Sequence, residues 1–155
     1  MRRGKRFVLS RTQVVPADLD EVFAFFKDPS NLAEITPPWL NFQVQWASDS
    51  VVREGTRIRY GIRWLGLPMR WESRIDRYVE NVCFADEMVV GPYRSWYHLH
   101  SFRPVPEGVQ VSDRVEYALP FGPMGLVAHA VVVRRQLEGI FDYRTRRISE
   151  IFAAP

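Results

Sequence analysis

The sequence predicts an α+β protein in which a curved antiparallel β-sheet packs against one long C-terminal helix. Two observations support this fold class. Residues 42–119 contain successive segments in which apolar and polar side chains alternate, which is typical of half-buried strands. Residues from about 126 to 150 instead carry apolar side chains at helical spacing. A sheet with one apolar face has to bury it, and this helix is the long amphipathic partner that the sequence offers.

The first part of the chain predicts one strand followed by two short helices. Residues 5–15 are rich in valine and phenylalanine and are interpreted as a strand. Asp18 is a suitable residue to begin a helix, and the dipeptide Asp28-Pro29 ends it. A second short helix fits residues 31–35. The two helices therefore form a bent pair between the first strand and the rest of the sheet.

Six further strands follow, and a breaker-rich segment separates them from the long helix. The strands are predicted at 42–47, 56–64, 69–76, 83–90, 94–103 and 109–119. The separating segment, 120–125, reads P-F-G-P-M-G and is unusually apolar for a solvent-exposed loop. It is interpreted as an entrance lid or a partner contact, with simple packing against the long helix as the alternative.

Length and composition indicate one globular domain spanning residues 1–155. A hydrophobic content of 46% and a charged content of 25% are ordinary for such a domain. No apolar run approaches the length needed to cross a bilayer, so no stable membrane insertion is expected. No signal-peptide pattern follows the basic start, and a cytoplasmic location is expected.

The charge distribution argues against nucleic-acid binding, and the cysteine count against a sulfur-rich site. Four of the 21 basic residues lie within the first six positions, and the remaining 17 are matched by 18 acidic residues. No broad basic surface is therefore expected, and no nucleic-acid partner. Cys83 is the single cysteine, which excludes an internal disulfide and a cysteine-rich zinc site.

The most informative segment is R-S-W-Y-H-L-H-S-F-R at 94–103. Because side chains on a strand alternate between its faces, Trp96, His98, His100 and Phe102 share one face. If this face points inward, two histidines lie inside an apolar interior, which is costly unless they find partners. Asp113 on the next strand is expected opposite about position 99, from which it can reach either histidine.

The candidate site admits several chemical interpretations. A hydrogen-bonded Asp–His pair that only fixes strand register is one. Polar anchors for a small molecule in an apolar pocket are another. General acid–base catalysis by His98, His100 and Asp113 is a third, because histidine exchanges protons near neutral pH. The fourth is a metal site, for which Asp113 or Glu87 could add a third ligand; no metal is expected, because the spacing does not assure that ligand.

Further candidate ligand-contacting residues come from the strand phases and the helix stripe. Arg144 lies on or beside this stripe, either as a residue whose charge extends to solvent or as one that points into the cavity toward Glu87, Asp113 or an acidic ligand. His129 is expected on the helix surface. The ligand-contacting set consists of Tyr60, Trp71, Glu87, Trp96, His98, His100, Asp113, Tyr117, Phe141 and Arg144.

The chain resembles the START/SRPBCC helix-grip superfamily over nearly its whole length. The resemblance rests on element order and on the segments N-L-x-x-I-T-P-P at 31–38, G-P…W-x-H-x-H-x-F at 91–102, D-x-V-x-Y at 113–117 and I-F-x-Y-R at 140–144. These patterns are similar to the birch-pollen-allergen-like proteins and to the bacterial polyketide cyclase/dehydrase-like branch. The resemblance implies a helix-grip fold, with a seven-stranded sheet around the long helix and a hydrophobic cavity between them.

The resemblance implies no single activity. The favoured hypothesis is binding of a small hydrophobic or amphipathic molecule, such as a lipid, a polyketide or an aromatic compound, without a cofactor. One alternative is a cofactor-independent cyclase or dehydratase that uses His98, His100 and Asp113. Another is a protein-interaction module, which needs an exposed apolar patch.

Overall fold

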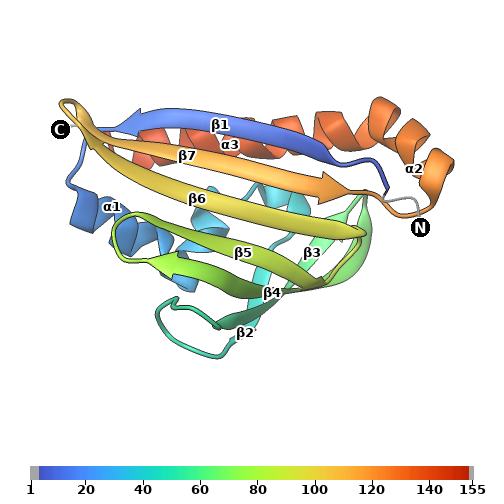
Figure 1. Ribbon diagram of the computed structural model, residues 1–155, viewed down its shortest axis with the longest axis horizontal. Coiled ribbons are helices and arrows are strands. Elements are labelled where there is room, and N and C mark those ends of the chain that lie inside the picture. Colours follow the sequence, from blue (N-terminus) through green and yellow to red (C-terminus); the bar gives the residue numbers. More distant parts are fainter. Residues whose placement is uncertain (1–3, 154–155) are drawn as a thin grey trace.

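The computed structural model describes residues 4–153, in which a curved sheet holds a long helix against one face (Figure 1). Seven antiparallel strands lie in the spatial order β1-β7-β6-β5-β4-β3-β2. The predicted α+β class, strand number and helix-grip arrangement are confirmed. The strands are β1 (Phe7–Val15), β2 (Gln43–Ala47), β3 (Arg57–Trp64), β4 (Leu67–Val79), β5 (Cys83–Val90), β6 (Ser95–Val105) and β7 (Gly108–Ala118).

Short helical segments connect β1 to β2 and close one end of the sheet. They are α1 (Leu19–Phe26) and the 3₁₀ segments η1 (Pro29–Ile35) and η2 (Pro38–Leu40). Asp18 precedes α1 as predicted, but its side chain accepts no capping hydrogen bond. Asp28 does cap the next segment, since its carboxylate accepts the backbone N–H of Ser30 at 2.9 Å.

The C-terminal helix runs in three consecutive parts without leaving the helical backbone region. They are α2 (Gly122–Ala128), a π-helical segment η3 (His129–Val133) and α3 (Arg134–Ile151). The prediction that His129 lies on the helix surface is wrong. Its ring is buried, stacks on Phe7 at 3.5 Å and hydrogen-bonds with the Tyr117 hydroxyl at 2.7 Å. A π turn holds more residues than an α turn, so a 3.6-residue pattern assigns this side chain to the wrong side.

The strand register brings His100 directly opposite Asp113 and His98 opposite Val115. Sequence counting predicted Asp113 near Leu99, so the register differs by one residue. This difference determines which histidine lies directly beside Asp113, because directly opposed residues on neighbouring strands have their side chains on the same face and in contact.

Two apolar clusters fill the space between sheet and helices. One surrounds Phe23 of α1 and includes Phe102 and Ile148, and the other includes Trp71, Val115 and Phe141. Tyr60 of β3 packs against both clusters. The interior is therefore continuous along the sheet, with a cavity where the two clusters meet.

Among the helices of residues 4–153, none is long and apolar enough to span a bilayer.

Candidate functional site

A cavity of about 170 Å³ lies between the concave face of the sheet and the C-terminal helix. Most of its lining is apolar and comes from nearly every element around it. The 3₁₀ segments and the residue just before β2 supply aliphatic and aromatic groups that the sequence interpretation did not include in the site. These additional lining residues include Leu32, Ile35, Leu40 and Phe42, together with Ile62 of β3 and Ile140 of α3.

Aromatic rings of three strands form one wall of the cavity. Tyr60 and Trp71 stack with centroids 5.9 Å apart and ring planes at 14°. Trp96 meets Trp71 edge to face at 5.3 Å. The indole N–H of Trp71 donates to the Ser73 hydroxyl at 2.9 Å, so its polar atom is satisfied within the wall. The wall therefore presents flat apolar faces to whatever occupies the cavity.

Five polar side chains from four elements meet at the cavity, and we call them the polar cluster: Asp86, His98, His100, Asp113 and Arg144. The Nε2 of His98 donates to Asp113 at 2.8 Å, and the Nε2 of His100 donates to Asp86 at 2.7 Å. The two imidazoles stack at 3.8 Å. The two Nε2 atoms thus donate to different carboxylates, which fixes the orientation of each ring.

Arg144 reaches the polar cluster from α3. Its side chain is 10% exposed, and Nη2 lies 3.6 Å from Asp113 Oδ1 and 3.4 Å from His100 Nδ1. The guanidinium also lies over the Phe26 ring at 5.4 Å. Of the two alternatives left open by the sequence, the structure has Arg144 lining the cavity.

The two carboxylates of the polar cluster are held in their charged form. Burial opposes ionisation of Asp113, but the charge of Arg144 and hydrogen bonds from both histidines hold the pKa of this carboxyl well below its ordinary value. Burial is likewise outweighed at Asp86, where the hydrogen bond from His100 and the neighbouring positive charges lower the carboxyl pKa.

The two histidines have pKa values displaced in opposite directions. Burial and the adjacent charge of His100 lower the pKa of His98, and the Asp113 hydrogen bond does not compensate. Burial also acts on His100, but its contacts with Asp113 and Asp86 outweigh it and raise the pKa. The shifts therefore favour the positive charge on His100 over that on His98. The two carboxylates of the polar cluster thus face the guanidinium of Arg144 and the imidazole whose charged form is favoured, that of His100.

We expect the His100→Gln variant to lose an alkaline decline in stability that the wild type shows. A raised histidine pKa stabilises the fold below the unfolded value of 6.5, and this stabilisation is lost as pH rises through the folded pKa. His98 has a lowered pKa, so its titration changes the stability at pH values below 6.5 and does not contribute to the alkaline decline. Urea midpoints measured from pH 6.5 to about 9, below the ordinary lysine pKa, test this.

His129→Gln is the matched control for the pH experiment. Burial lowers the pKa of His129, so this residue also affects the pH dependence of stability only at pH values below 6.5. Its replacement should therefore leave the decline in stability at alkaline pH as in the wild type. An unchanged alkaline decline in His100→Gln would contradict the assignment of the raised pKa to His100.

Asp86, His98 and His100 could each offer one metal-ligand atom, and these atoms lie within 4.8 Å of one another. Two imidazoles and a carboxylate are suitable donors for zinc or iron. Here, however, both Nε2 atoms carry protons that are donated to carboxylates, and Arg144 already supplies a cation 3.6 Å from Asp113. A divalent ion would have to displace a proton from an imidazole and lie near the guanidinium.

The structure brings most of the sequence-predicted residues to the cavity. Those that line it are Tyr60, Trp71, Trp96, His98, His100, Phe141 and Arg144. Asp113 does not line the cavity itself, but its carboxylate contacts His98, His100 and Arg144, which do. Tyr117 is buried, with its ring centroid 6.0 Å from that of Trp96, and its hydroxyl forms a hydrogen bond with His129. It therefore packs behind the aromatic wall and does not line the cavity.

The placement of Glu87 in the interior is wrong. Its carboxylate lies on the convex face, half-exposed, and accepts from Arg74 at 3.2 Å. The inward-facing acid of β5 is its neighbour Asp86, because Phe84 and Asp86 share the concave face. The sequence contained one signal for this, namely the even spacing from Phe84 to Asp86.

Comparison with known proteins agrees with this geometry. The family model described as "Polyketide cyclase / dehydrase and lipid transport" matches residues 15–140. A protein of Chromobacterium violaceum is 13% identical, with a TM-score of 0.71 over 96% of this chain and 99% of that one. Major latex-like protein 151 of Panax ginseng is 14% identical, with a TM-score of 0.68 over 97% and 100%.

A protein of Thermus thermophilus is 19% identical, with a TM-score of 0.60 over 94% of this chain and 92% of that one. No curated protein matches the chain. At these identities the solved structures show a shared fold, whereas the family model covers most of the chain. The helix-grip resemblance inferred from the sequence is thereby confirmed, and the chain belongs to the polyketide cyclase/dehydrase and lipid transport family.

Proposed function

We propose that the protein binds a small, mostly apolar molecule that carries one anionic or hydrogen-bond-accepting oxygen. The observation that carries this proposal is the Nε atom of Arg144. It is buried, it belongs to a side chain that lines the cavity, and it has no hydrogen-bond partner among residues 4–153. A buried donor without an acceptor is costly, and an oxygen of a bound molecule would satisfy it.

The cavity supports a ligand of modest size. Its volume of about 170 Å³ is close to that of apolar cavities that accommodate a benzene ring. Flat faces of Trp71 and Tyr60 suit an aromatic ring, with offset or edge-on contacts. These features favour a compound of one or two rings over a long acyl chain.

Calorimetric titration with 1-naphthoate and the isosteric, neutral 1-naphthamide tests the proposal. We expect the wild type to prefer the carboxylate by about tenfold, since a charge-assisted hydrogen bond contributes roughly 1.5 kcal/mol or more. Arg144→Gln should remove this preference. The ratio of the two affinities within one variant is unaffected by partial unfolding, so Arg144→Gln is informative even where it is destabilised.

Arg146→Gln is the matched control, because Arg146 lies on the same helix with its side chain exposed. Native mass spectrometry of gently purified protein adds a test that needs no probe, since a retained small molecule would identify the ligand class. Equal affinity for the acid and the amide would contradict the anionic contact. Absence of binding for both, with no retained molecule, would contradict ligand binding itself.

Acid–base chemistry is the second candidate function, favoured by the two His–carboxylate pairs beside the cavity. A carrier returns its ligand unchanged, whereas a cyclase or dehydratase would convert a polyketide-like substrate over many turnovers. For an enzyme, His100→Gln should lower turnover by ~10²–10⁴ with binding nearly intact. Such turnover by the wild type would replace the carrier proposal.

A further inference from the structure

One end of the molecule carries an apolar helix that the fold leaves largely uncovered. Segment α2 projects beyond the end of the sheet (Figure 1), and Phe121 and Met124 are 82% and 77% exposed. Between Phe121 and Val133 only Gly125, His129 and Val133 are buried, so the segment contacts the body along a single stripe. A helix that is apolar on all sides is normally covered on all sides.

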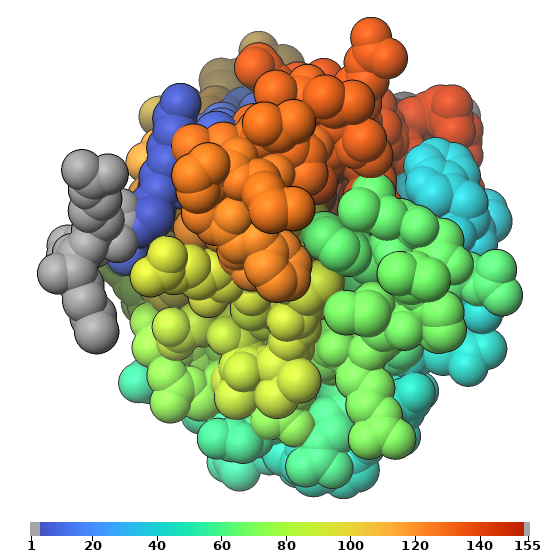
Figure 2. Space-filling view, turned by 90° about the vertical axis from the view of Figure 1, so that its right-hand side faces the viewer, coloured from blue at the N-terminus to red at the C-terminus, as the bar shows by residue number. Residues whose placement is uncertain are grey.

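Apolar residues of the β3–β4 turn extend this surface. Leu65 and Leu67 are exposed there. Figure 2 shows the orange α2, the green β3–β4 turn and the yellow-green β5–β6 turn together on one face. A hydrogen bond from Trp64 Nε1 to the Tyr93 hydroxyl at 3.2 Å joins the end of β3 to the β5–β6 turn, and Arg94 N–H donates to the carbonyl of Ala118, the last residue of β7 before α2, at 2.9 Å. We call this surface the apolar tip: Leu65, Leu67, Phe121, Met124, Val127 and Val131.

Two residues of the apolar tip occupy backbone positions that other residue types fill at lower cost. Leu65 has φ 51° in a two-residue turn, where asparagine is preferred, and Phe121 has φ 70° before α2. Large apolar side chains are disfavoured at positive φ. Burial does not offset this cost here, because the side chains of Leu65 and Phe121 are both exposed. Contact with something outside the chain would account for them.

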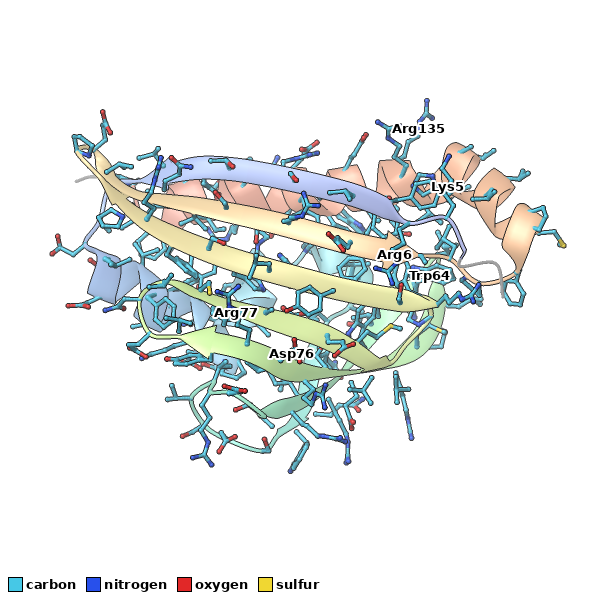
Figure 3. The ribbon with its side chains drawn as sticks, in the orientation of Figure 1. Lys5, Arg6, Trp64, Asp76, Arg77 and Arg135 are labelled. Carbon is cyan, nitrogen blue, oxygen red and sulfur yellow. The ribbon has the colours of Figure 1, made fainter. Side chains whose placement is uncertain are left out.

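Positive charge borders the apolar tip. Residues 118–133 contain no charged side chain, and the turn sequence W-L-G-L-P-M is flanked by Arg63 and Arg70. Figure 3 shows Lys5, Arg6 and Arg135 toward the same end of the molecule as α2. Six exposed cations of this region have no carboxylate within 4.0 Å among the described residues: Lys5, Arg6, Arg63, Arg70, Arg94 and Arg135.

We propose that the apolar tip docks reversibly on the surface of an anionic lipid bilayer. Protruding Phe, Met, Leu and Val side chains can enter the boundary between headgroups and acyl chains, while surrounding lysines and arginines meet lipid phosphates. A second copy of this chain is a poorer occupant, because a symmetric contact would bring the same cations against each other. The charge complementarity therefore selects a negatively charged partner with an apolar interior.

Docking at this end would also place the cavity beside the bilayer. Trp64 and Tyr93 line the cavity, and they belong to the β3–β4 turn region and to the β5–β6 turn. Their hydrogen bond joins two parts of the cavity lining near the apolar tip. In this respect the inference rests on the proposed function, because an apolar ligand could then pass between lipid and cavity without crossing water. Docking itself requires no ligand.

Co-sedimentation of the full chain with vesicles tests the proposal. We expect binding to phosphatidylcholine vesicles that contain phosphatidylserine, little binding to pure phosphatidylcholine, and weaker binding as salt rises. The double variant F121N/M124Q should bind at least about tenfold more weakly, since two apolar side chains lose their contact with the membrane. Each of the single variants R63Q and R135Q should weaken binding by about fivefold.

V79Q/V82Q is the matched control, because both valines are exposed at the turn between β4 and β5. This variant should bind vesicles as the wild type does. Failure of the wild type to sediment with any vesicles at low salt would overturn the proposal. So would a dimer in sedimentation velocity that F121N/M124Q abolishes, or salt-insensitive binding to neutral vesicles. Vesicle binding is measured without a probe, so its failure is separable from failure of the naphthoate titration.

Discussion

Replacing Arg144 by methionine is expected to lower the free energy of unfolding by about 3–5 kcal/mol. The guanidinium is a buried cation 3.6 Å from Asp113, and its charge is a main reason for the depressed pKa of that carboxyl. Methionine fills similar space without charge, so the variant leaves a buried carboxylate with histidine partners alone. Urea denaturation at neutral pH measures the difference.

Arg146→Met is the matched control for this change. Arg146 lies two residues further along the same helix and pairs at 4.0 Å with Glu150 on the exposed face. Its replacement should cost no more than about 1 kcal/mol. A double variant with Asp113→Asn and Arg144→Met should recover part of the loss, because it leaves no unpaired charge. An equally small loss in Arg144→Met and Arg146→Met would contradict the inference that Arg144 stabilises the buried carboxylate of Asp113.

Trp71→Ala is expected to destabilise the fold by about 3–5 kcal/mol. Trp71 is buried and contacts Tyr60, Tyr93 and Trp96, so its loss removes the centre of the aromatic wall. It also removes the indole N–H that donates to the Ser73 hydroxyl. Thermal and urea unfolding both measure the effect.

Trp46→Ala distinguishes a buried tryptophan from an exposed one. Trp46 lies on the edge strand β2 with Arg59 over its ring at 4.7 Å. Its removal should cost no more than about 1 kcal/mol, the usual scale of an exposed cation–π contact. A loss in Trp71→Ala that is no greater than this would mean that the wall rearranges to fill the space, and the cavity would then not be a fixed feature.

Strand phase was the part of the site that the sequence predicted well. Trp71, Trp96, His98 and His100 lie in segments where apolar and polar residues alternate, so period-2 counting assigns them all to one face. Asp113 was also identified, although its partner residue was displaced by one position. Alternation is a local property of a strand, and it survives small errors in register.

Features that depend on irregular backbone escaped the sequence. Asp86 and Glu87 are adjacent acids in a strand whose first three residues are all apolar and buried, so alternation was absent there and the spacing from Phe84 was the single signal that Asp86 faces inward. The ladder between β4 and β5 also shifts register twice, which periodicity does not predict. His129 was misplaced for a related reason, since its π turn departs from the 3.6-residue repeat.

The π turn of η3 sets how α2 is rotated relative to α3. Each residue of an α-helix advances the side-chain direction by about 100°. The wider π turn takes up about one extra residue, so removal of one residue from 129–133 would restore α-helical winding and leave α2 in nearly its present rotation. Removal of one residue from the α-helical part after 133 would instead rotate α2 about its own axis by roughly 100° relative to the rest of α3. The buried Gly125 would then turn toward solvent, and a bulkier residue would meet Leu119 and Pro120 in its place. The π turn is therefore the part of this helix where a single-residue deletion would disturb this end of the molecule least.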